Sequence, residues 1–107
     1  MKDADIQRLR HIQVYCKDIS AYIKRFGDDF QSFDTDSAYF DSVSMCLLQI
    51  GELANGLSQD FRALTTNRIQ WNLVRGMRNW IAHAYQQVEK ETIWGTVKGY
   101  SGASSVL

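Results

Sequence analysis

The residues best suited to chemistry lie in one segment toward the end of the chain, residues 71–85. Arg75, Asn79 and His83 are spaced four residues apart, so a helix would align them along one polar ridge. An imidazole can transfer a proton near neutral pH, and a guanidinium can stabilise negative charge that builds up on a phosphate. The spacing therefore favours acid–base chemistry beside a phosphate. His11, the other histidine, has no reactive neighbour in the sequence, and we expect it to be an ordinary solvated residue.

A helix must position these side chains, and the sequence predicts one from about residue 68 into residues 83–85. The Thr-Thr-Asn run at residues 65–67 offers a cap for its start. Gly76 lies on its polar side, where it would let a ligand or another chain approach closely. The apolar residues recur on the opposite side and should face the core. They are Val74, Met77, Ile81, Ala84 and Val88.

Two long helices are predicted ahead of this segment. The first covers about residues 3–26, where apolar residues recur every three or four positions, and Gly27 follows as a carboxyl-terminal cap. Residues 28–36 are acidic and aromatic, which is typical of a connector. The second helix begins near Asp36, a favourable amino-terminal cap, and an apolar stripe continues to Leu57.

Shorter elements complete the chain. Residues 61–64 are expected to form a short helical turn, and residues 89–98 a last, weaker helix. Residues 100–107 have the composition of a flexible tail. No strand-like alternation competes with these helices. The prediction is an all-α fold: one domain over residues 1–107, a small up-and-down helical bundle of four to five helices that dimerises.

Charge is segregated along the chain, although twelve Lys and Arg balance twelve Asp and Glu. Residues 26–60 carry seven acidic residues and no basic one, whereas residues 61–85 carry four arginines and no acidic residue. Arginine suits bidentate contacts with phosphate, although these arginines could instead pair with the acidic segment. The zero net charge argues against tight binding of nucleic acid along the whole molecule, and it leaves room for a small basic cleft.

The sequence also indicates where the protein resides. No apolar run approaches the length of a membrane helix, and the charged start of the chain is unlike a signal peptide. Cys16 and Cys46 fall at apolar helical positions and form no metal-binding pattern, so we expect them to be reduced and buried. These features predict a cytoplasmic protein without a membrane segment, a metal or a cofactor.

The same segment resembles a known family. Residues 78–83 fit the R-x4-H signature of HEPN-domain ribonucleases, and Tyr85 extends it to the R-x4-H-x-Y form of the HepT-like toxins of HEPN/MNT toxin–antitoxin systems. Residues 50–54 and 88–94 are similar to the family as well, and the resemblance spans roughly residues 5–98.

The resemblance implies a homodimer with two copies of the motif in one cleft, and metal-independent RNA cleavage through attack by the ribose 2′-OH. On that basis His83 would act as general base or acid, Arg78 would stabilise the phosphate and Asn79 would assist in positioning. Arg75, on the same polar ridge, would contact the RNA. Tyr85 would receive AMP from the partner, a nucleotidyltransferase antitoxin, and a bulky anion there would repel RNA. Tyr85 could otherwise be an ordinary packed aromatic residue.

Two other interpretations stay open at this point. The chain could be a non-catalytic helical subunit that binds a substrate or nucleotide for a partner nucleotidyltransferase. It could also be a purely structural dimer, in which Asn79 and His83 only form interface hydrogen bonds. A second, mixed helical face could meet a partner or simply be solvated. Its members are Ala38, Met45, Gln49, Glu52 and Gly56.

Overall fold

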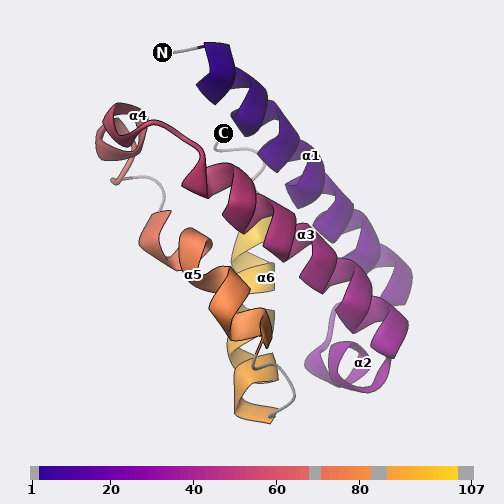
Figure 1. The fold of residues 1–107 in the computed structure, drawn as a ribbon. Coiled ribbons are helices and arrows are strands. Elements are labelled where there is room, and N and C mark those ends of the chain that lie inside the picture. The colour runs from indigo at the N-terminus through magenta and orange to yellow at the C-terminus, as the bar shows by residue number, and fades with distance from the viewer. Residues whose placement is uncertain (1–2, 68–70, 83–86, 104–107) are drawn as a thin grey trace.

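A computed structural model describes residues 3–67, 71–82 and 87–103. These residues form six helices and no strand, which confirms the predicted all-α class, with one or two helices more than expected. Successive long helices run in alternating directions, as in an up-and-down bundle (Figure 1). Dimerisation stays a prediction. None of the helices in the described ranges combines the length and the apolar character that crossing a bilayer requires.

Helix α1 (Asp3–Phe26) has the predicted bounds. Ile12, Cys16 and Ile19 are buried on its inner face, at the spacing that places residues on one side of a helix. The helix ends at Gly27, which has a φ of 123° and donates its backbone N–H to the Ile23 carbonyl oxygen at 3.0 Å. A positive φ is readily adopted by glycine, so this residue ends the helix as predicted.

The predicted connector at residues 28–36 is wrong in its centre, where the chain forms helix α2 (Phe30–Thr35). The Asp29 carboxylate caps this helix by accepting the Ser32 backbone N–H at 2.8 Å. Phe33 is fully buried, with its ring close to those of Tyr39 and Trp94. A six-residue helix is too short to show a recurring apolar pattern, and its stability comes from the cap and these ring contacts.

Helix α3 (Ser37–Asn55) begins as predicted, because the Asp36 side chain accepts the backbone N–H groups of Ala38 and Tyr39. Its predicted apolar stripe, which runs on to Leu57, is the centre of the core. Leu53 is partly buried, and the other members of the stripe are buried. They are Tyr39, Val43, Cys46, Leu47, Ile50, Ala54 and Leu57.

Three helices follow. Helix α4 (Gln59–Leu64) is the predicted short turn, capped by the Ser58 hydroxyl, which accepts the Phe61 backbone N–H. Helix α5 (Trp71–Ala82) is the predicted third long helix, and residues 68–70 and 83–86 on either side lie outside the described residues. Helix α6 (Gln87–Ala103) extends beyond the predicted end at Lys98, although Gly99 and Gly102 lie in its last turns. The flexible tail predicted for residues 100–107 is therefore wrong for residues 100–103, where no proline interrupts the helix.

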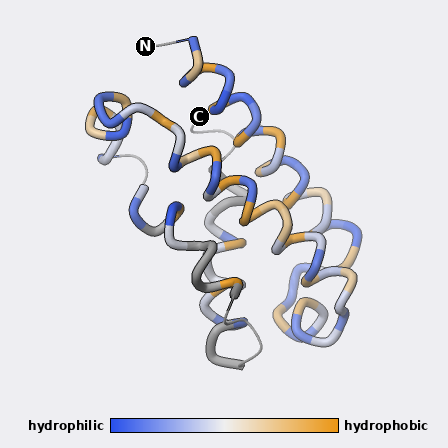
Figure 2. Tube along the Cα trace, viewed as in Figure 1, coloured by the Kyte–Doolittle hydropathy of each residue, from blue (hydrophilic) through white to orange (hydrophobic). Residues whose placement is uncertain are grey.

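Helix α3 lies in the middle of the bundle and packs against α1 on one side and α5 on the other. Helix α6 contacts α1, α5 and α2 and covers the remaining side of the core (Figure 1). Along α1 and α3 hydrophobic and hydrophilic residues alternate with the helical turn, as Figure 2 shows. The polar side of α5 therefore lies beside α3, at the edge of the core.

Both cysteines are buried free thiols, as predicted. Because they are buried, the stability of the fold decreases at alkaline pH. Burial raises the pKa of each thiol to about 11, with smaller contributions at Cys46 from Asp18 and from Cys16. The neutral thiol is thus favoured in the folded chain, while an unfolded thiol ionises near pH 8.5. Their contribution to stability is complete below about pH 8.5 and is lost as the pH rises toward about 11.

We expect the urea midpoint of the wild-type chain to fall between about pH 8 and about pH 10, where the unfolded thiols ionise. A Cys16→Ala variant is less stable at neutral pH but should lose less of its stability over that interval. Urea unfolding followed by circular dichroism measures both. An equal loss in the two proteins would mean that Cys16 does not contribute to the pH dependence.

Candidate active site

Helix α5 carries the candidate site, and its two sides differ as the sequence predicts. Val74 is buried on the inner side, and Ile81 is partly buried against the core. Asn72 and Arg75, on the predicted polar side, are exposed. The helix therefore turns an amide and a guanidinium outward while its apolar residues attach it to the bundle.

Two contacts fix α5 against the rest of the molecule. Trp71, at its start, is 4% exposed and donates its indole N–H to the Thr65 hydroxyl at 2.7 Å. Gly51 on α3 faces the α5 backbone, because a β-carbon at that position would lie 3.3 Å from the Val74 carbonyl oxygen. The absence of a side chain thus lets α3 and α5 pack closely.

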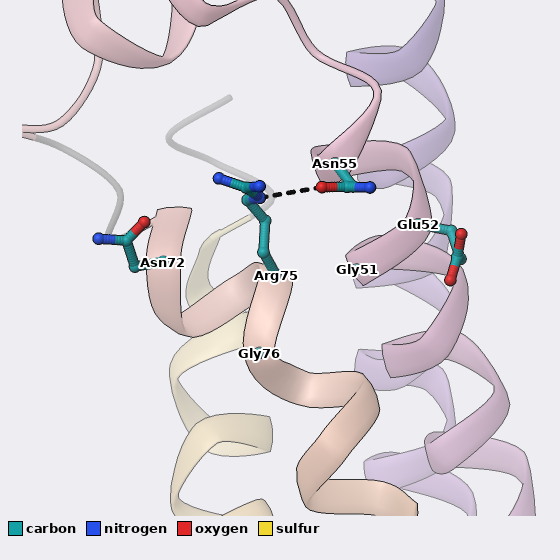
Figure 3. Close-up of a pocket in the computed structure, with 6 residues that line it drawn as sticks. All are labelled: Gly51, Glu52, Asn55, Asn72, Arg75 and Gly76. Atoms are coloured by element: carbon teal, nitrogen blue, oxygen red, sulfur yellow. Dashed lines mark hydrogen bonds between the residues drawn. The ribbon is translucent and has the colours of Figure 1, made fainter.

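A polar pocket opens between α3 and α5 beside this contact. Its volume is about 410 Å³. Its lining combines charged residues, amides and glycines, and the Glu52 carboxylate lies on the side of α3 away from Arg75 in the view of Figure 3. Helix α3 supplies three of its residues and α5 the other three. The lining consists of Gly51, Glu52, Asn55, Asn72, Arg75 and Gly76.

Arg75 is held across this pocket by a residue of α3. Its Nε–H donates a hydrogen bond of 3.1 Å to Oδ1 of Asn55, and both residues are exposed. Figure 3 shows this bond, with the guanidinium placed between the two amides of Asn55 and Asn72 in that view. A long, flexible side chain is thereby aimed at the opening.

Two aspartates of the acidic segment, residues 26–60, pair with lysines of α6. Lys90 on α6 lies 3.5 Å from a carboxylate oxygen of Asp34 and donates to its carbonyl oxygen at 3.2 Å. Lys98, also on α6, pairs with Asp28. Within the part of the chain that the structure describes, Arg75 forms no ion pair, and the alternative that it pairs with the acidic segment is wrong for this residue. Its charge is available to an anionic ligand.

The predicted site residues fall into two groups. Arg75 lies in the pocket, together with Asn72 from the same polar side. Arg78 and Asn79 belong to α5, but their side chains are not among those described, and His83 and Tyr85 lie outside the described residues. The position of Asn55 in this pocket was not predicted from the sequence. Its only signal is its place three residues after Glu52, on the same face of α3.

Known proteins are similar to this chain over a stretch that includes the candidate site. A family model described as "Ribonuclease HepT-like" matches residues 12–100, a stretch that includes all of α3 and α5. The chain is also similar to a protein of Caldanaerobacter subterraneus subsp. tengcongensis that is provisionally named an RNase. The two are 29% identical over 89 residues, which make up 83% of this chain and 77% of that protein. No solved structure matches the chain at a significant level.

The helical bundle and the matched region define a ribonuclease-type HEPN domain, in agreement with the resemblance seen in the sequence. The chain belongs to the HepT-like ribonuclease family. Its matched stretch includes both ends of the R-x4-H motif, Arg78 and His83. Membership supports ribonuclease as the general class of activity.

Proposed function

We propose that the protein is a metal-independent endoribonuclease toxin. The attacking group in the cleavage reaction is a 2′-hydroxyl of the RNA itself. The observation that carries this proposal is the family match over residues 12–100, which includes the Arg78 and His83 motif. The exposed Arg75 guanidinium, on the same helix as Arg78, supports it, because an exposed cation favours a polyanionic substrate.

In the proposed reaction the 2′-oxygen attacks the adjacent phosphorus atom while a general base removes the 2′-proton. The new O–P bond closes a 2′,3′-cyclic phosphate, and the bond to the 5′-oxygen breaks. A general acid returns a proton to that oxygen, so the charges balance without a metal ion. His83 fills one of these roles and His83 of the partner subunit the other, in a homodimer whose cleft holds both motifs.

Two further residues complete the proposed site. The Arg78 guanidinium stabilises the charge that builds up on the phosphate oxygens during attack. Asn79 orients the phosphate or the histidine through its amide. Both residues lie on α5, which the Trp71 anchor and the close packing at Gly51 hold in place. A rigid helix is a suitable support for such a reaction, because small displacements of catalytic groups reduce the rate.

The test is cleavage of an RNA oligonucleotide by the purified chain in excess EDTA. We expect cleavage to proceed, with fragments that end in a 2′,3′-cyclic phosphate. The matched control substrate is the same oligonucleotide with 2′-fluoro groups, which lacks the attacking hydroxyl and should stay intact. Cleavage of the fluorinated strand, or a requirement for added Mg²⁺, would overturn the mechanism.

The proposal includes control by a partner nucleotidyltransferase, an antitoxin that transfers AMP from ATP to the Tyr85 hydroxyl. The tyrosine hydroxyl loses its proton to solvent or base and its oxygen attacks the α-phosphorus of ATP, so that a new O–P bond forms and pyrophosphate leaves. The attached AMP adds negative charge two residues from His83, where it would repel RNA phosphates.

Co-expression with such a nucleotidyltransferase should therefore add the mass of one or more AMP groups to the chain and suppress RNA cleavage. A Tyr85→Phe variant should gain no such mass. Tyr15→Phe, on α1, is the matched control and should be modified like the wild type. Intact-protein mass spectrometry measures all three. An unmodified wild-type chain would contradict the proposed regulation.

A further inference from the structure

We propose that the pocket between α3 and α5 binds one nucleotide of the RNA substrate, and that Asn55 is a positioning residue that aims Arg75 at its phosphate. The inference rests on the proposed ribonuclease function and extends it to residues outside the R-x4-H motif. It assigns a role to Asn55, whose amide is the hydrogen-bond partner of the Arg75 guanidinium.

The donor groups of Arg75 suit a phosphate. A guanidinium has five N–H donors in a fixed fork, and the bond to Asn55 uses only the one at Nε. The four donors on the two Nη atoms are arranged for bidentate contact with a phosphate. Because Asn55 is a neutral amide, it holds the side chain without neutralising its charge. A carboxylate at this position would hold it equally well and cancel that charge.

The rest of the lining suits a base or a ribose. The amides of Asn55 and Asn72 each offer donors and an acceptor. Single-stranded RNA is recognised through such contacts to the edges of unpaired bases. The pocket volume of about 410 Å³ falls within the range of small-molecule sites, roughly 300–1,000 Å³.

Gly76 leaves the α5 side of the pocket bare. A β-carbon at this position would meet no atom of the described residues within 4 Å, so a ligand can approach the helix backbone there. Arg75 precedes Arg78 by three residues, a rise of about 4.5 Å along a helix. A nucleotide in the pocket would therefore adjoin the phosphate that Arg78 contacts in the proposed reaction. The pocket would act as a binding subsite beside the point of cleavage.

Binding of a 2′-fluoro RNA oligonucleotide, which cannot be cleaved through a 2′-hydroxyl, tests this at several salt concentrations. Arg75→Ala should weaken binding about ten- to a hundredfold, as expected for the loss of a charge-assisted contact. The slope of log K against log salt should become shallower by about 0.7, the value for one phosphate contact on a single strand. Arg10→Ala, which removes an exposed cation of α1, is the matched control and should leave both quantities unchanged.

Two substitutions of Asn55 separate a positioning role from a merely structural one. Aspartate matches asparagine in shape more closely than alanine does. The carboxylate of Asn55→Asp would nevertheless pair with Arg75, so this variant should weaken binding and flatten the salt slope as Arg75→Ala does. Asn55→Ala leaves the charge free but unaimed, so it should weaken binding only about three- to tenfold and keep the slope. A structural role would reverse the order, with Asp milder than Ala.

Filling the pocket provides a second test, in which weaker binding of RNA cannot result from a loss of folding. Gly76→Ala adds a methyl group to the lining and should raise the melting temperature, since alanine is the better helix former. It should nevertheless weaken binding of the oligonucleotide several-fold. Gly95→Ala on α6 is the matched control, because a β-carbon there also meets no atom within 4 Å in the part of the chain that the structure describes. It should raise the melting temperature and leave binding unchanged.

The outcomes distinguish this inference from the proposed function. If the wild type cleaves RNA in EDTA while the Arg75, Asn55 and Gly76 variants bind the oligonucleotide like the wild type, the subsite is wrong and the ribonuclease proposal stands. If the wild type neither cleaves nor binds RNA, both are overturned. Weaker binding with a flatter slope for Arg75→Ala and Asn55→Asp, but not for Arg10→Ala, supports the subsite.

Discussion

Replacing His83 with alanine is expected to lower the rate of RNA cleavage at least about a hundredfold, with the fold intact. Transfer of a proton by a positioned side chain contributes roughly 10²- to 10⁴-fold to a rate. The proposed reaction needs a base for the 2′-hydroxyl and an acid for the 5′-oxygen. In a homodimer with two equivalent histidines, the substitution removes both groups at once, so the loss should lie toward the upper end of that range.

The matched control is His11→Ala, which removes the other histidine. His11 is exposed on α1, and its loss should leave the rate of cleavage unchanged. Initial rates in EDTA compare the three proteins, and circular dichroism verifies that each is folded. Equal rates for the wild type and His83→Ala would remove His83 from the mechanism. A loss of activity in His11→Ala as well would point to a general effect on the protein rather than to proton transfer.

Replacing Leu47 with alanine is expected to reduce the free energy of unfolding by about 2–5 kcal/mol, the usual cost of truncating a buried leucine. Leu47 is fully buried on α3, the helix that packs against both α1 and α5. The truncation removes apolar contacts and leaves a cavity that surrounding helices fill only in part. Because small domains are stable by only about 5–15 kcal/mol, a large fraction of this variant could unfold at moderate temperature.

Leu64→Ala is the control for this effect, because it makes the same chemical change at a residue that is 80% exposed. Leu64 is the last residue of α4, and its truncation should change stability by no more than about 0.5 kcal/mol. Urea unfolding measures both variants. Equal losses at the two positions would show that Leu47 is not part of the cooperative core.

The bounds of α1 and the start of α3 could be predicted because the determining interactions are local. Gly27 and Asp36 act on the backbone within a few residues of their own positions. Helix α2 could not be predicted, since its six residues hold no recurring pattern and Phe33 is buried against Tyr39 and Trp94 from other parts of the chain. Contacts between distant segments are not visible in local spacing.

The candidate site shows the same limit. The polar side of α5 could be predicted, since the angle between Arg75 and Val74 follows from helical geometry. The partnership of Arg75 with Asn55 could not, because the two residues are 20 positions apart and meet only through the packing of α3 on α5. The roles of Arg78, Asn79, His83 and Tyr85 rest on the family resemblance.

Gly51 has a consequence for the size of the pocket between α3 and α5. The spacing of α3 and α5 depends on a hydrogen atom where other residues carry a side chain, since a β-carbon would lie 3.3 Å from the Val74 carbonyl oxygen. Any larger residue would push the two helices apart and widen the pocket between them. The size of the ligand that this pocket could admit can therefore be altered by the scaffold alone, with every polar residue of its lining kept.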